Sequence, residues 1–198
     1  HFPPFRVEGA MERPYFLRRL KLFAGLMAAA LLILAGVAWW QRAPLLAWYS
    51  VHRLVHAPDS ARRPWVDRVA QLELTALPRL ITCLRSGNTQ ICGRAQEGLL
   101  GIVRRWGPSD SRRAGLARSL AEQFAMLSEP GQQVALLVQA YLLKTTQAGA
   151  ACNLLPATTR MLAESCRTAD PMVHERAMAL VFPLADLRTK PELLDACR

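Results

Sequence analysis

The residues of this chain best suited to covalent chemistry are its five cysteines. Cys83 and Cys92 stand on either side of a Ser-Gly-Asn turn, so in an antiparallel helix pair they could face each other, and a disulfide is geometrically possible in an oxidising compartment. The alternative is that both are small buried hydrophobes. Cys152 and Cys166 would lie about 20 Å apart on a continuous helix and cannot pair directly. Because the count is odd, at least one thiol stays free or bonds to a partner.

The histidines give a weaker signal for a metal. His52 and His56 are spaced i, i+4, which places both imidazoles on one helix face. No carboxylate or cysteine lies close enough in sequence to complete a coordination sphere. The dipeptide His174-Glu175 matches half of a zinc-protease motif, but the second histidine is missing. The sequence therefore predicts no metal site.

Catalytic motifs are absent from the sequence. It contains no GxSxG, HExxH, phosphate-binding loop, dinucleotide fingerprint or CxxC pair. Acidic residues are scattered singly, without the pairing that general acid–base catalysis needs. We therefore predict no catalytic residues, no cofactor and no enzymatic activity, with an enzyme of unrecognised type as an alternative.

Positive charge is concentrated in the first two thirds of the chain. The formal net charge is +10, and residues 42–118 carry thirteen basic and five acidic side chains. A basic stripe on helices can bind nucleic acid, which gives a second alternative function. Arginines on helix exteriors are more often simply solvated, so we expect nucleic acid not to be the partner. The candidate basic surface consists of Arg94, Arg104, Arg105, Arg112, Arg113 and Arg118.

A long apolar run near the N-terminus predicts a membrane anchor. Residues 22–40 are nineteen consecutive uncharged positions, and a helix of that length spans roughly 28 Å. We place the transmembrane helix at 16–42, after an N-terminal extension at 1–15. A cleavable signal peptide is the alternative, although its apolar stretch would be shorter. The residues expected at the membrane interface are Arg18, Arg19, Lys21, Trp39 and Trp40.

The basic cluster before this run favours a cytoplasmic N-terminus and an extracytoplasmic C-terminal domain. Residues 43–63 are then a juxtamembrane segment that continues the anchor or lies along the lipid headgroups. Met11 reads like a natural start, so residues 1–10 are assigned no structure. The partners expected from this arrangement are membrane lipid, a protein, and a larger membrane complex.

From residue 64 onward the apolar spacing is helical, and each stripe must bury one face against a neighbouring helix. Four short breakers interrupt it: 86–88, 107–109, 129–131 and 170–171. The stripes that begin at Ile91, Val134 and Val173 are 43 and 39 residues apart. This period predicts a solenoid of two-helix repeats. The expected fold is therefore all-α, a single transmembrane helix followed by about three helix pairs.

Residues 64–198 resemble the HEAT-repeat family. The Leu-Pro pairs at 77–78 and 155–156 resemble the opening of its first helix, and "DPMVHERAMALV" resembles its inter-helix turn and second helix. The chain departs from the family at Cys92, Ala135 and His174, where an arginine is usual. The resemblance implies an α-solenoid whose extended surface binds proteins. We expect a membrane-anchored, non-catalytic scaffold or accessory subunit.

Overall fold

The computed structural model describes residues 42–189, together with Met27 and Gly36. The chain divides into two units, His1–Arg42 and Ala43–Arg198, and the second contains nearly all the described residues. Every regular element in 42–189 is a helix, so the all-α prediction agrees with the structure. The main helices are α2 (Arg42–His56), α3 (Arg62–Leu72), α4 (Leu77–Cys83), α5 (Thr89–Arg105), α6 (Arg112–Gln123), α7 (Glu129–Thr145), α9 (Leu155–Ser165) and α10 (Pro171–Thr189). A short helix, α8 (Ala148–Ala151), and the 3-10 turns η1 (Asp59–Ala61), η2 (Glu73–Thr75), η3 (Phe124–Met126) and η4 (Cys152–Leu154) connect them.

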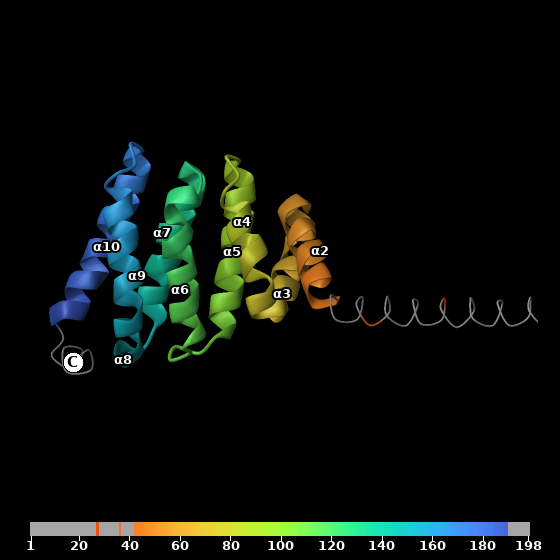
Figure 1. Ribbon diagram of the computed structural model, residues 1–198, viewed down its shortest axis with the longest axis horizontal. Coiled ribbons are helices and arrows are strands. Elements are labelled where there is room, and N and C mark those ends of the chain that lie inside the picture. Colours follow the sequence, from red (N-terminus) through yellow and green to blue (C-terminus); the bar gives the residue numbers. More distant parts are fainter. Residues whose placement is uncertain (1–26, 28–35, 37–41, 190–198) are drawn as a thin grey trace, which may run out of the picture. The chain divides into compact units, whose positions relative to one another are not determined.

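The helices of the second unit pack as successive pairs (Figure 1). One layer is continuous, because α3 packs on α5, α5 on α7, and α7 on α10. The helices α4, α6 and α9 form the other layer, in which α6 packs on α9. Each helix contacts mainly its neighbours in the stack, an arrangement consistent with an α-solenoid. The stripes beginning at Ile91, Val134 and Val173 are the three later helices of the continuous layer.

Helix α2 differs from its prediction as a juxtamembrane segment. It is amphipathic, and one face is buried at Ala47, Val51, Leu54 and Val55. A methyl group on Gly98 of α5 would lie 3.0 Å from the Leu54 side chain, so α2 and α5 approach closely. Helix α2 therefore belongs to the helical unit and forms its first pair with α3, ahead of the three pairs expected from the sequence.

The predicted single-pass membrane topology is not borne out and is corrected. Within the part of the chain that the structure describes, no helix is both long enough and apolar enough to cross a membrane. The longest, α10, has 19 residues, but three consecutive polar or charged positions, His174, Glu175 and Arg176, interrupt it. The membrane location and the assigned orientation are withdrawn with the topology. Apart from Met27, Gly36 and Arg42, the predicted span 16–42 lies outside the described residues, as do Arg18, Arg19, Lys21, Trp39 and Trp40.

Three of the four predicted helix breaks lie where the structure ends one helix and begins the next. The turns at 86–88 and 107–109 separate helices, and α10 begins at Pro171. The segment 129–131 is instead the first turn of α7, with Ser128 as the N-cap. Proline is tolerated in a first helical turn because its missing N–H has no partner there anyway. The residues of 129–131, which are typical of a helix break, therefore form the start of a helix here.

Candidate interaction surface

Helices α2 and α3 carry a cluster of exposed aromatic side chains. Trp48 is 49% exposed and Tyr49 is 45% exposed, although both belong to a helix that buries its other face. The Tyr49 ring meets the Trp65 ring of α3 edge-on, with 5.8 Å between the ring centroids. Large apolar groups gathered on a surface mark interaction sites more often than isolated ones do.

Two histidines extend this cluster along α2. The His52 ring stacks on Trp48 with 5.5 Å between centroids, and the His56 ring lies 4.3 Å from that of His52. The pair shares one helix face, as the i, i+4 spacing predicts. His56 Nδ1 lies 2.9 Å from the backbone oxygen of His52, so a hydrogen bond to that carbonyl requires the tautomer protonated at Nδ1. Among the described residues no group of three or more His, Cys, Asp or Glu side chains is placed to hold a metal ion.

Arginine side chains surround the Trp65 ring. The guanidinium carbons of Arg53 and Arg68 lie 5.3 and 5.9 Å from its centroid, within the range of cation–π contact. Both arginines are exposed. A pocket of about 390 Å³ opens between the two helices. We call the set Trp48, Tyr49, His52, Arg53, His56 and Trp65 the α2–α3 aromatic surface.

The six arginines of the predicted basic surface have three different environments. Arg104, Arg105 and Arg118 are exposed. Arg94 is half-buried, donates to the backbone oxygen of Val55 and lies 3.7 Å from an Asp59 carboxylate oxygen. Arg112 and Arg113 are engaged inside the helix stack. The structure therefore does not bring all six together on one exposed basic surface.

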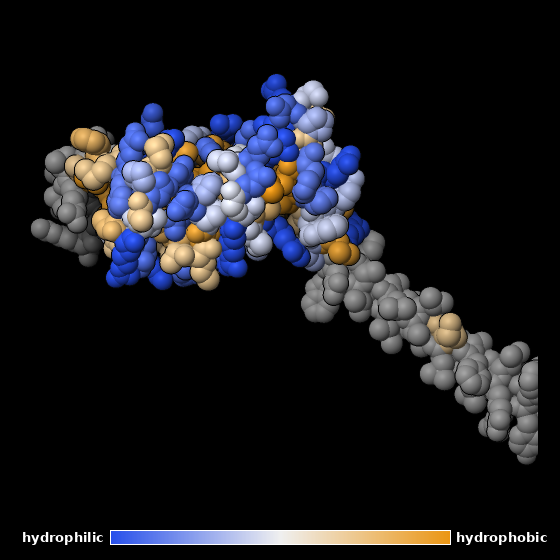
Figure 2. Space-filling model, turned by 90° about the horizontal axis from the view of Figure 1, so that it is seen from above, coloured by the Kyte–Doolittle hydropathy of each residue, from blue (hydrophilic) through white to orange (hydrophobic). Residues whose placement is uncertain are grey.

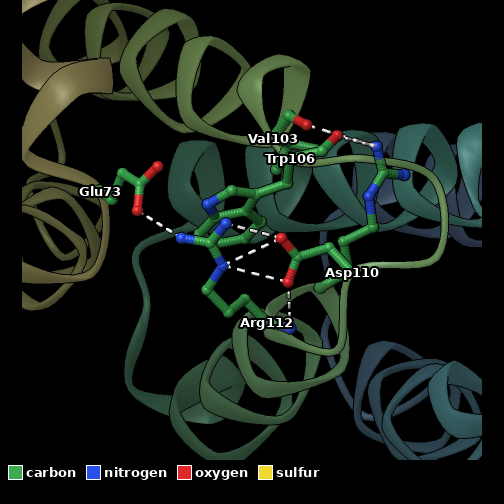
Figure 3. A network of polar contacts seen from close by, with 6 residues as sticks. Glu73, Val103, Trp106, Asp110 and Arg112 are labelled. Atoms are coloured by element: carbon green, nitrogen blue, oxygen red, sulfur yellow. Dashed lines mark hydrogen bonds and ion pairs between the residues drawn. The ribbon is translucent and has the colours of Figure 1, made fainter.

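Arg112 joins two turns of the fold (Figure 3). Its Nη2 lies 2.6 Å from an Asp110 carboxylate oxygen, Nη1 pairs with Glu73, and the guanidinium lies 5.2 Å from the Trp106 ring centroid. Hydrogen bonding from Arg112 lowers the pKa of the Asp110 carboxyl. Glu73 has a positive φ of 45°, which is strained for a residue with a side chain. The ion pair holds this strained residue at the end of α3.

Arg113 is a core residue, only 4% exposed. Its Nη2 donates to the backbone oxygens of Val103 and Trp106 at the end of α5, at 3.3 and 3.1 Å. Its Nη1 donates to the hydroxyls of Thr145 and Thr146 at the end of α7, at 2.8 and 3.2 Å. A cation is favourable at a helix C-terminus because the carbonyl dipoles there point outward. Arg113 therefore fastens two neighbouring pairs together and is unavailable to a ligand.

The candidate disulfide residues Cys83 and Cys92 are free thiols in the structure. They lie close, as the turn predicts: the Cys92 thiol is 3.8 Å from the backbone oxygen of Cys83 and donates to the oxygen of Ser86 at 3.2 Å. Burial raises the pKa of both thiols, and the proximity of Cys92 further raises that of Cys83. Cys166 is an exposed free thiol, and Cys152 is disulfide-bonded.

Sequence reasoning missed the junction between α4 and α7. The Ser128 hydroxyl donates to the backbone oxygens of Leu84 and Ser86, at 2.9 and 2.6 Å, and accepts from the Gly131 N–H at 3.2 Å. A serine followed closely by a proline at the start of an apolar helical stripe is an N-cap signal. That signal could have located the start of α7. It could not have shown that the same hydroxyl also caps the end of α4.

Comparison with known proteins finds no match among family models, curated proteins or solved structures.

Proposed function

We propose that this chain is a non-catalytic, HEAT-like helical-repeat scaffold that binds a protein partner through the α2–α3 aromatic surface. The observation that carries the proposal is the exposure of Trp48 and Tyr49 beside a pocket of about 390 Å³ between α2 and α3. Tryptophan, tyrosine and arginine are the residue types that dominate the energetics of protein interfaces. All three are present on this surface.

The charges around the pocket indicate the chemistry of the partner. Arg53 and Arg68 are exposed near the Trp65 ring, whereas Arg62 is paired with Glu97 at 2.8 Å. The exposed positive charge complements an acidic segment. The pocket itself suits an apolar side chain, because its walls are largely aromatic. The proposed partner is therefore a protein segment with an apolar anchor residue flanked by aspartate or glutamate.

A peptide selection tests this proposal. Random short peptides displayed on phage are selected on the immobilised full chain, and enriched sequences are synthesised for titration. We expect enrichment of aromatic or leucine residues next to acidic ones. Binding should weaken as ionic strength rises, because salt screens exposed charge pairs.

Surface variants then locate the binding site. Trp48→Ala and Tyr49→Ala should each weaken binding about tenfold or more, which corresponds to about 1.4 kcal/mol. The matched control is Met126→Ala, which removes an exposed apolar side chain, 57% accessible, from a different element. Circular dichroism confirms that each variant folds. Selection without enrichment, or peptides that bind Trp48→Ala as tightly as the parent, would overturn the proposal.

A further inference from the structure

A second pocket, polar rather than apolar, lies at the junction of α2, α3 and α5. Its volume is about 450 Å³, and its walls come from η1, from the start of α3 and from the N-terminal half of α5. Two arginines, Arg62 and Arg94, meet two carboxylates there, Asp59 and Glu97, and the other lining residues are uncharged. The formal charge of the lining is therefore zero as the side chains stand.

Both arginines of this pocket are held in place by other parts of the fold. Arg94 Nη1 donates to the backbone oxygen of Val55 in the last turn of α2. Arg62 Nη1 donates to Oε1 of Glu97 on α5, at 2.8 Å. Both arginine side chains are half-buried. Because their guanidinium groups are already ordered, a ligand that binds them does not have to order them first.

The other donors of the two guanidinium groups are only partly satisfied. Arg62 Nη2 pairs with Oδ1 of Asp59, and Arg94 Nη2 lies 3.7 Å from the same oxygen, which is too far for a hydrogen bond. Arg62 Nε is buried and has no hydrogen-bond partner among the described residues. A buried donor without an acceptor is unfavourable. Asp59 is therefore an imperfect ligand for this pair of arginines.

Asp59 is also weakly held. Its side chain is 84% exposed, and ion pairs at such exposure contribute little to stability because water competes for both partners. When Asp59 turns to solvent, the lining keeps two arginines and one glutamate, a net charge of +1 that matches one carboxylate. Nε and Nη2 lie on one edge of the planar Arg62 guanidinium, so an incoming carboxylate can accept hydrogen bonds from both. Arg94 Nη2 supplies a further donor.

The polar pocket adjoins the pocket of the α2–α3 aromatic surface. Pro58 and Ala61 line the aromatic pocket, whereas Asp59 and Arg62 line the polar one, so η1 forms a wall of both. Figure 2 shows hydrophilic residues over much of the end of the helical unit that carries α2 and α3, with hydrophobic patches between them. A short segment with an apolar residue next to an acidic one can therefore reach both pockets.

We propose that the polar pocket binds a carboxylate of the partner between Arg62 and Arg94, in place of Asp59. This carboxylate belongs to the acidic residue that flanks the apolar anchor, so the inference rests on the proposed function. Asp59 then acts as an internal competitor, which occupies the two arginines until the partner arrives. Because the apparent affinity falls with the fraction of time that the site is occupied, removal of the Asp59 charge should strengthen binding.

Acetate tests the pocket without any partner. Proton–nitrogen NMR spectra of the labelled full chain report the Nε–H signal of Arg62, which is identified by its absence from Arg62→Lys. Acetate should shift this signal saturably in Asp59→Asn, with an affinity about tenfold higher than in the parent. Chloride at the same ionic strength and inorganic phosphate should shift it less. A signal in Asp59→Asn that acetate leaves unmoved, or that phosphate moves more, would overturn the proposal.

The peptides enriched by phage selection test the partner's carboxylate. The matched control for Asp59→Asn is Asp67→Asn, which removes the same charge from an exposed position of α3 outside the pocket. Asp59→Asn should bind these peptides about tenfold more tightly than Asp67→Asn. The difference should disappear when the acidic residue of the peptide is replaced by its amide. Circular dichroism confirms that both variants fold.

The two proposals fail in different ways. If the peptides bind Asp59→Asn and Asp67→Asn equally, the carboxylate site is overturned and the proposed function stands. If the selection enriches no peptide, the proposed function is overturned, and the acetate titration decides the carboxylate site by itself.

Discussion

Gly131 is the position at which the smallest substitution should have the largest effect. A Cβ atom at this residue would lie 1.8 Å from the backbone oxygen of Leu84 and 2.8 Å from its carbonyl carbon. Both are backbone atoms, so no side chain can rotate away to make room. Gly131→Ala must therefore move the first turn of α7 away from the end of α4.

The cost has two sources. Overpacking a close contact typically destabilises a protein by about 1–3 kcal/mol. The displacement also stretches the bonds that Ser128 makes to Leu84, from its N–H at 3.2 Å and from its hydroxyl at 2.9 Å. Each such bond contributes about 0.5–1.5 kcal/mol. We expect Gly131→Ala to lower the free energy of unfolding by about 2–4 kcal/mol.

Thermal and urea unfolding followed by circular dichroism measures this change. A loss of that size should lower Tm by roughly 5–15 °C for a domain of this length. The matched control is Gly115→Ala on the exposed side of α6, where an added Cβ meets nothing within 4 Å. Alanine there should leave stability unchanged or raise it by up to about 1 kcal/mol. If Gly131→Ala melts with the parent protein, the close approach of α7 to Leu84 is incorrect.

Three further predictions concern buried or paired groups. Arg113→Ala should destabilise by about 2–4 kcal/mol, since it removes charged hydrogen bonds to two helix ends, whereas exposed Arg118→Ala should have little effect in the same urea titration. The pKa of Asp110 is lowered on folding, so its contribution to stability is present above about pH 4 and is lost as pH falls through the folded pKa. Tm measured against pH should therefore show the parent more stable than Asp110→Asn at neutral pH, with the difference shrinking in acid; a constant difference would contradict this. Cys166 is exposed whereas burial raises the pKa of Cys83, so mass spectrometry after brief iodoacetamide treatment at neutral pH should find Cys166 modified first, and the reverse order would be inconsistent with the structure.

The sequence by itself determined where most helices lie. Apolar residues repeat with helical spacing from Ile91 to Trp106, and five of the six predicted stripe residues are buried, with Ile91 partly so. This succeeds because a helix exposed on one side must bury a stripe of about that width, whatever its neighbours are. The turns at 86–88 and 107–109 were equally predictable, since glycine, proline and asparagine act through local backbone geometry.

Only the tertiary structure decided which polar residues are available to a partner. Arg112 and Arg113 are adjacent and chemically identical, yet one pairs with carboxylates and the other caps two helix ends in the core. A rotation of about 100° per residue separates their directions on α6. What each direction meets depends on where α5 and α7 end, which no local pattern encodes. Arg112 and Arg113 therefore do not belong to an exposed basic surface, and the sequence alone could not identify them as exceptions.

The candidate interaction surface shows the same division. The segment "PLLAWYSVHRLVHAP" is nearly continuously apolar, and this pattern suits a membrane interface as well as a packed helix. Packing against α5 buries Leu54 and leaves Trp48 and Tyr49 exposed. The hydrophobicity of a side chain predicts only that its burial away from water is favourable. Which residues find a neighbouring helix, and which remain for a partner, is set by how the pairs stack.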